Sequence, residues 1–178
     1  MALTISSSKS STLEPLRKNR WFITFTSIPG STSSTASEEL AFCAHTANRP
    51  QQTFNEVVSH RMNEQFKIAG KVAWNDLSMS FYDYINGINS ASQIVWDWSK
   101  LVYNPITGQQ GFKTQYSTSA TLAMLDPLGG VVQVWNLFYI WPQEINYNDL
   151  SSEDDGLCEV NVTFKYDYAI KGTDINTK

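Results

Sequence analysis

The sequence predicts a mainly β fold, an antiparallel sandwich or barrel capped by one α-helix. Aromatic residues make up 13% of the 178 residues, and flat aromatic side chains pack well on the pleated surface of a sheet. Charged residues reach only 17%, whereas about 25% is usual for a soluble chain. Several segments alternate apolar and polar residues, but only one follows the helical period. The length suits one domain.

The first half of the chain predicts a polar N-terminal arm, residues 1–19, followed by a domain over residues 20–178. Aromatic and β-branched runs predict the strands, and a Ser/Thr-rich stretch ending at Ser37 predicts a loop. Residues 50–70 resemble a long polar hairpin. The expected strands of this half are, in order, 21–26, 40–46, 53–60 and 66–70.

One helix is expected over residues 89–102. Asn89 or Ser90 can cap it, because either side chain accepts hydrogen bonds from backbone N–H groups. Asn104-Pro105 ends it. Its apolar stripe is formed by Ile94, Val95, Trp98, Leu101 and Val102.

The remaining strands are expected on either side of this helix. Residues 126–130, Asp-Pro-Leu-Gly-Gly, predict a tight turn between two of them. In residues 157–170, Cys158 and every second residue to Ile170 are expected to face the core, with polar residues on the other face. The expected strands are 72–83, 116–125, 131–140 and 157–170.

The formal net charge of −4 and the pI near 5.1 disfavour a surface that grips nucleic acid or an anionic membrane. No apolar run is long enough to span a membrane, and the N-terminus lacks a secretory signal pattern. Cys43 and Cys158 are expected to be buried free thiols of an intracellular protein.

The search for catalytic motifs returns nothing, so the sequence predicts a binding or assembly role and not an enzyme. There is no nucleophile elbow and no phosphate-binding loop. His45 and His60 are expected to be ordinary strand residues, and Glu153-Asp154-Asp155 lacks the spacing of a calcium loop. We therefore expect no cofactor and no metal.

The order of features resembles the tail tube proteins of contractile-tailed, T-even-like bacteriophages, over roughly residues 20–172. The segments that carry the resemblance are RWFITF (20–25), FKIAGK (66–71), WNDLSMSFYD (74–83), VWDW (95–98), VYNPITG (102–108), WNLFYIWP (135–142) and VNVTFKYDYA (160–169). The resemblance implies subunits that form hexameric rings, which stack into a hollow tube inside a contractile sheath. Sheets from six neighbours would join into one barrel around the channel.

The same resemblance implies partners and surfaces. The partners would be further copies of the chain, the sheath protein, baseplate or tube-initiator proteins, a tape measure protein, and DNA in transit without specific binding. The location would be the virion tail, assembled in the host cytoplasm, with no membrane contact. The hairpin at 50–70 would contact the adjacent ring through Phe54, Val57, Val58 and Phe66.

The polar face of the last alternating strand is expected to look into the channel. Its residues are Glu159, Asn161, Thr163, Lys165 and Asp167. An outward or sheath-facing position of this face stays open, as does a mobile surface loop at 50–70. Two other functions also stay open: the inner tube of a bacterial contractile injection or secretion system, and a carbohydrate-binding β-sandwich.

Overall fold

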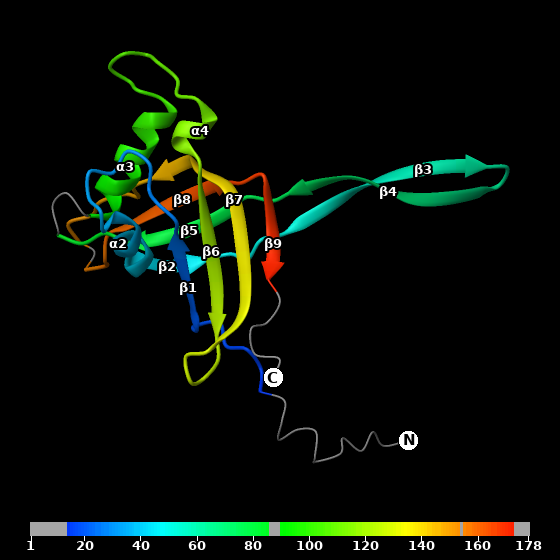
Figure 1. The fold of residues 1–178 in the computed structure, drawn as a ribbon, viewed down its shortest axis with the longest axis horizontal. Helices are drawn as coiled ribbons and strands as arrows, with labels where there is room; N and C mark the ends of the chain where they lie inside the picture. Colours follow the sequence, from blue (N-terminus) through cyan, green and yellow to red (C-terminus); the bar gives the residue numbers. More distant parts are fainter. Residues whose placement is uncertain (1–13, 86–89, 154, 173–178) are drawn as a thin grey trace.

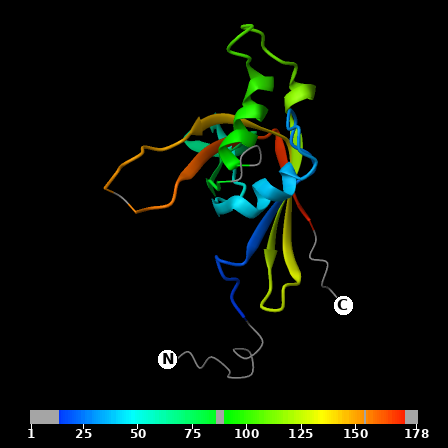
Figure 2. The same cartoon turned by 90° about the vertical axis from the view of Figure 1, so that its left-hand side faces the viewer.

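A computed structural model describes residues 14–85, 90–153 and 155–172. They form two packed antiparallel sheets with helices at one end and a long two-stranded arm at the other (Figures 1 and 2). The elements are β1 (Trp21–Phe25), α2 (Ala36–Cys43), β2 (Ala44–Ala47), β3 (Gln52–Arg61), β4 (Glu64–Trp74), β5 (Leu77–Tyr82), α3 (Ala91–Val102), α4 (Lys113–Tyr116), β6 (Thr118–Leu125), β7 (Val131–Asn146), β8 (Glu159–Lys165) and β9 (Tyr168–Gly172).

Strand β7 belongs to both sheets. Its first part pairs with β6 and β9, and β1 adds to β6; we call this the front sheet, because it faces the viewer in Figure 1. Its second part pairs with β8, which continues through β5 to β2; we call this the back sheet. The sheets are mainly antiparallel and do not close into a barrel.

A bulge in β7 allows this change of sheet. Leu137 pairs with Ala120 and Ile140 with Thr118, so β7 carries one extra residue between the two pairs. Tyr139 lies in this interval with a φ of 58°, an uncommon conformation for a residue with a side chain. Bulges of this kind bend a strand and increase its twist. The predicted end of the strand expected at 131–140 is wrong, because β7 continues through Trp141-Pro142 to Asn146.

The core lies between the sheets and beneath α3. Trp98 is fully buried, and its ring contacts Phe25 and Phe164, with centroids 5.9 and 5.7 Å away. The Trp98 Nε1–H donates to the carbonyl of Tyr116 over 2.6 Å, which joins α3 to the end of α4. The helix therefore holds the open end of the sandwich together.

The predicted helix is confirmed. Helix α3 begins after Ser90, whose Oγ accepts a hydrogen bond from the Gln93 N–H over 3.3 Å. Ile94, Val95 and Trp98 are buried, as the apolar stripe predicted. The mainly β class is likewise confirmed.

Two other helices were not predicted. The strand expected at 40–46 is wrong, because residues up to Cys43 belong to α2 and only Ala44–Ala47 form a strand. Ala36, Leu40 and Cys43 are buried at helical spacing on one side of α2. Helix α4 occupies Lys113–Tyr116, where the strand expected at 116–125 should begin.

Two expected strands are each divided. Residues 72–83 contain the end of β4 and all of β5, separated at Asn75-Asp76. Residues 157–170 contain β8 and the first part of β9, separated at Tyr166-Asp167. The break reverses the alternation, so Ala169 is buried whereas Tyr168 and Ile170 are exposed, contrary to the prediction.

The two cysteines differ in burial. Both thiols are free, but only Cys43 is buried, so the prediction of a buried thiol is confirmed there and wrong at Cys158. Burial raises the pKa of Cys43, as do the Asp83 and Glu39 carboxylates. Most of the predicted N-terminal arm, residues 1–13, lies outside the described residues, while residues 14–19 are exposed. Among the described residues, no helix has the length and apolarity needed to cross a membrane.

Candidate functional site

The hairpin formed by β3 and β4, which we call the arm, is the feature that departs most from a closed sandwich. Strands β3 and β4 pair only with each other and project from the body (Figure 1). Every residue of β3 is exposed, and so is almost every residue of β4. A two-stranded hairpin is marginally stable by itself in water. Its exposure on both faces therefore indicates a contact surface.

One face of the arm carries an apolar cluster. The register pairs Val57 with Ile68, and Phe66 lies two residues from Ile68 on the same face. We call these three residues the arm's apolar face. Each keeps 49–57% of its surface exposed. The structure thus brings together two of the four residues predicted to contact an adjacent ring, and adds Ile68.

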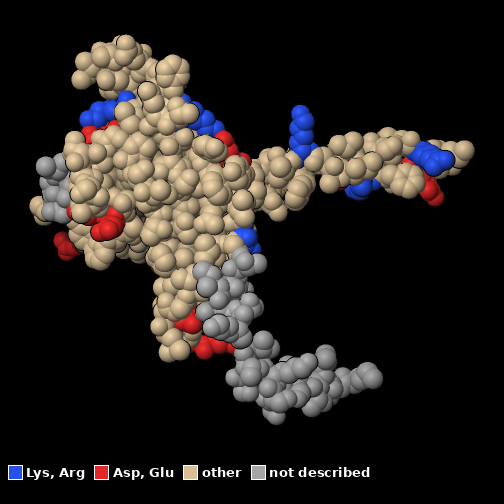
Figure 3. Space-filling model, in the orientation of Figure 1, with Lys and Arg blue, Asp and Glu red and all other residues tan. Residues whose placement is uncertain are grey.

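The opposite face of the arm is mixed, and it includes the other two predicted residues. Val58 pairs with Lys67, whose ammonium group lies 3.2 Å from the Glu56 carboxylate, and Phe54 pairs with Val72 nearer the base. Lysine and arginine side chains stand out along the arm in Figure 3. Phe54 and Val58 therefore point away from Val57 and Phe66. The middle of the arm is amphipathic, like a strand that is covered on one side only.

A bulge near Asn55 sets this register. A Cβ on Gly70 would lie 2.9 Å from the Asn55 carbonyl oxygen, closer than real Cβ contacts allow. The extra residue lies in β4, where Gly70 and Lys71 stand opposite Asn55, so Val72 lies on the opposite face from Ile68 although the two are four residues apart. Strand β3 keeps its plain alternation, which places Phe54 and Val58 on the face opposite Val57.

The base of the arm is held by side-chain amides. Asn75 donates from its backbone N–H to the Gln51 carbonyl over 2.9 Å and from its side chain to Gln51 Oε1 over 3.3 Å. Asn48 accepts from the Ser78 N–H over 2.7 Å and donates to the Asp76 carbonyl over 3.1 Å. These bonds link both segments that enter and leave the arm, so its direction is fixed by the body.

The exposed face of the back sheet is polar across its strands. Asn161 lies between Ser80 of β5 and Asn146 of β7, and Thr163 lies between Ser78 and Glu144. Thr46 of β2 continues the row beside Ser80 and hydrogen-bonds to it. This surface is the polar face of the back sheet.

Four of the five residues predicted to face a channel lie on this surface. Glu159, Asn161, Thr163 and Lys165 alternate along β8 opposite the buried residues. Lys165 lies 2.5 Å from the Asp76 carboxylate. Asp167 follows β8, and its carboxylate is 2.5 Å from Lys113 of α4. The structure therefore separates Asp167 from the other four.

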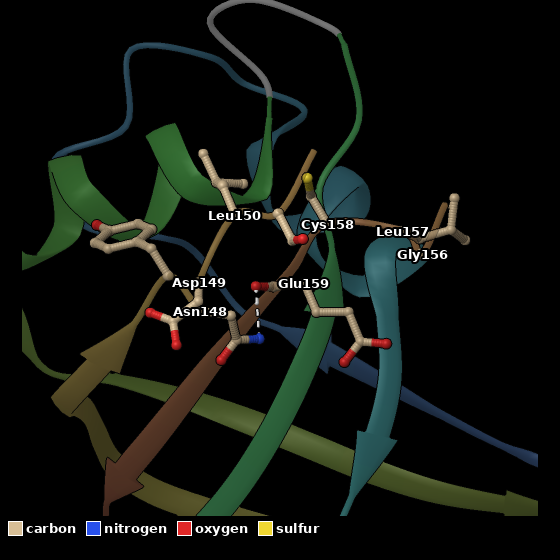
Figure 4. A pocket seen from close by; sticks show the side chains of 9 residues that line it. Asn148, Asp149, Leu150, Gly156, Leu157, Cys158 and Glu159 are labelled. Atoms are coloured by element: carbon tan, nitrogen blue, oxygen red, sulfur yellow. Dashed lines mark hydrogen bonds between the residues drawn. The ribbon is translucent and has the colours of Figure 1, made fainter. Parts of the chain in front are cut away.

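The segment between β7 and β8 surrounds a cavity of about 310 Å³ (Figure 4). Asn148, with a φ of 54°, donates from its side chain to the Glu159 carbonyl over 3.0 Å and accepts from the Asn161 amide over 2.9 Å. Tyr147 lines this cavity, and burial and the Asp83 carboxylate raise its pKa. The hydrogen bonds of Asn148 shape the loop and create no arrangement of nucleophile and base.

The histidines lie apart. His45 contacts Tyr82, with its Nε2 3.1 Å from the hydroxyl oxygen, while His60 is exposed on the arm. Among the residues that the structure describes, no group of three or more His, Cys, Asp or Glu is placed to hold a metal.

Comparison with known proteins identifies the fold. No family model and no curated protein matches the sequence. A chain of the PVC sheath–tube complex, an extracellular contractile injection system in its extended state, superposes with a TM-score of 0.68 at 11% identity, over 96% of this chain and 99% of that chain. A chain of the anti-feeding prophage baseplate gives 0.66 at 14% identity, over 90% and 97%.

A chain of the anti-feeding prophage tube-terminating cap gives a TM-score of 0.66 at 13% identity, over 97% of this chain and 99% of that one. The chain therefore has a fold found in contractile injection assemblies. At these identities the likeness concerns the fold.

Proposed function

We propose that this chain is a structural subunit of an inner tube, built from stacked hexameric rings within a contractile sheath. The observation that carries the proposal is the amphipathic arm projecting from a sandwich with open sheet edges. The fold shared with contractile injection assemblies supports it. So does the resemblance of the sequence to phage tail tubes.

Ring formation would complete the sheets. In the described structure, β1 pairs only with β6, and β2 pairs only with β5. An unpaired edge leaves backbone N–H and C=O groups free to pair with another chain. A closed ring of identical subunits satisfies such edges without leaving an end.

The arm would join one ring to the next. Its apolar side chains cannot be covered by the body from which it projects (Figure 1), so the cover must come from another molecule. We propose that Val57 and Phe66 make this contact together with Ile68, whereas Phe54 and Val58 lie on the opposite face of the arm.

The polar face of the back sheet would line the channel. It carries the carboxylates of Asp76, Glu144 and Glu159 against the single ammonium group of Lys165. An excess of negative charge keeps DNA from adhering, because affinity for DNA depends on cationic groups that displace counterions. Asp167, beside α4, is not needed for this wall.

The proposed role is non-enzymatic, and the partners follow from it. They are further copies of the chain, the sheath, baseplate or initiator proteins and a tape measure protein, in a virion tail assembled in the host cytoplasm. DNA would pass through without specific binding. No cofactor enters this role.

A second candidate is the inner tube of a bacterial injection system, which would carry protein cargo in place of a genome. The likeness to extracellular contractile injection systems favours it. Neighbouring genes discriminate: capsid and terminase genes indicate a phage, and their absence beside sheath and baseplate genes indicates an injection system.

The decisive experiment shortens the arm. Thr53 and Ala73 pair across the arm, so replacing residues 54–72 by Asn-Gly closes a short hairpin without disturbing the body. Negative-stain microscopy of the wild type should show rings and tubes, and the shortened variant should give folded subunits or single rings. Normal tubes from the shortened variant would contradict the role of the arm. A wild-type protein that stays monomeric at high concentration, even with a baseplate, would overturn the proposed function.

A further inference from the structure

The rows of side chains across the exposed face of the front sheet carry no charge, and the Lys113–Asp167 ion pair borders this face beside Tyr139 and Tyr168. The register places Phe22, Ala123 and Val134 in one row across β1, β6 and β7, and Phe138 beside Tyr168 in another. We call these residues, together with Ile170, the front face. The row between the two contains Thr24, Thr121, Asn136 and Ile170.

The front face is suited to apolar contact. Ile170, Tyr168 and Phe22 expose 51%, 39% and 38% of their surface, and the Phe138 and Tyr168 rings stack with centroids 4.7 Å apart. Figure 3 shows an uncharged surface over the middle of β6 and β7, with acidic side chains near the turn that joins them. The back sheet, in contrast, presents Asp76, Glu144, Glu159 and Lys165. The two outer surfaces of the sandwich therefore favour different partners.

The arm has the complementary properties. Its apolar face is uncharged at Val57, Phe66 and Ile68, with Arg61 and Glu64 following only towards the tip, and its other face keeps Glu56 and Lys67 in water. Ten extended residues in β3 give it a length of roughly 33 Å. The front sheet is four strands wide, about 14 Å between its outer strands, and a two-stranded arm about 5 Å wide fits across it.

The arm cannot reach the front face of its own subunit, because it leaves the body from the back sheet and points away (Figure 1). We propose that the apolar face of the arm packs on the front face of a second copy. This inference rests on the proposed function and adds the receiving surface, which neither the sequence nor the fold comparison supplies.

The main rival surface is a cleft beside α3. Trp96, Tyr103, Pro142 and Ile145 line this apolar cleft of about 300 Å³. That volume suits one or two side chains, whereas the arm presents three along two strands. The cleft serves as the competing outcome of the test.

Cysteine cross-linking in assembled tubes tests the contact. In a Cys158→Ser background, which retains the buried Cys43, Ile68→Cys is combined with Ile170→Cys. Oxidation or a short bismaleimide should then link different copies into ladders on a denaturing gel. Lys67→Cys with Ile170→Cys is the matched control, because Lys67 lies on the opposite face of the arm. It should give no ladder. The background alone should give none either.

The competing pair is Ile68→Cys with Ile145→Cys. A ladder from this pair, and none from the pair with Ile170, would overturn the inference and place the arm in the cleft beside α3. Equal ladders from Ile68 and Lys67 would also overturn it, because they would indicate collision without a defined face.

A substitution gives an independent readout. Ile170→Asp should raise the concentration needed for tube formation at least tenfold and leave the circular dichroism of the subunit unchanged. Ile106→Asp, at a position 92% exposed in a loop, is the matched control and should assemble normally. Normal assembly of Ile170→Asp would overturn the inference while the tube function stands. A wild type that forms no tubes would overturn both.

Discussion

A charge on the arm's apolar face should block assembly without harming the subunit. Ile68 exposes 57% of its surface in the free subunit. Burying a whole isoleucine side chain contributes about 1.5–3 kcal/mol, so the part that remains to be buried is worth about 1–2 kcal/mol for each contact. Ile68→Asp loses this term and also places a carboxylate in an apolar contact, which costs several kcal/mol more.

The expected loss is therefore at least about 3 kcal/mol per arm, or more than 100-fold in the binding constant of one contact. Every arm in a ring carries the change, so the losses accumulate. Sedimentation over a concentration series measures the threshold for tube formation, and microscopy identifies the product. Ile68→Asp should give soluble, folded material with no tubes.

Gln65→Asp provides the matched control, because Gln65 is an exposed, uncharged residue of the same strand and lies on the face opposite Phe66 and Ile68. It places the same carboxylate on the arm with the opposite orientation, so its assembly threshold should change little. If Ile68→Asp assembled at the wild-type concentration, or if Gln65→Asp were equally harmful, the assignment of the two faces would be wrong.

Three further predictions concern the subunit. Met62 has a φ of 55° at the tip of the arm, so Met62→Gly should be more stable locally than Met62→Val by about 1–2 kcal/mol. Amide hydrogen exchange across β3 and β4 should therefore be about 5- to 30-fold slower in Met62→Gly than in Met62→Val. Equal rates in the two variants would contradict this. Trp98→Phe removes the hydrogen bond to Tyr116 and part of the core, so urea unfolding should show a loss of about 2–4 kcal/mol, and a loss below 1 kcal/mol would count against it. The pKa of Cys43 is raised in the folded protein, so as the pH rises its thiol ionises first in the unfolded chain. The free energy of unfolding should therefore fall above about pH 9 by up to about 1.4 kcal/mol per pH unit. Cys43→Ala should flatten this slope, and an unchanged slope would exclude Cys43 as its cause.

The sequence predicted best where one local signal was sufficient. In β8, Val160, Val162 and Phe164 are buried by plain alternation. The turn after β6 is equally local: the Asp126 carboxylate accepts from the Leu128 and Gly130 N–H groups over 2.8 and 2.7 Å. In such segments the residue pattern and the tertiary structure require the same conformation.

Prediction failed where two signals competed over a few residues. Ala41 to Ala44 form an apolar run, which reads as a buried strand, but the burial of Ala36, Leu40 and Cys43 follows the helical period. The outcome depends on the contact of α2 with β1, and a single sequence does not contain that distant contact. The strand expected at 131–140 also stopped before Pro142, because proline usually ends a strand. Strand β7 instead continues through Pro142, since a strand that changes sheets can carry a proline at its bulge.

The candidate surfaces were predicted by residue type but not by orientation. Phe54, Val57, Val58 and Phe66 are all apolar, but the alternation of β3 places Phe54 and Val58 on the face opposite Val57. Ile68 could have been found from the alternation of β4, which places it beside Phe66. The bulge at Gly70 and Lys71 carries Val72 to the opposite face, which alternation does not reveal. Asp167 was grouped with β8 because the strand was expected to continue, and the break at Tyr166-Asp167 carries it to Lys113.

The arm also presents an energetic conflict that its base resolves. An apolar hairpin face in water favours collapse onto the nearest apolar surface, which would be the body of its own subunit. The hydrogen bonds of Asn48 and Asn75, and the contact of Trp74 with Tyr166 at 5.9 Å between centroids, oppose that collapse by fixing the exit of both strands. The free subunit therefore keeps its apolar face exposed and directed outward. Contact with another copy then needs little rearrangement, because the ordering of the arm has already occurred on folding.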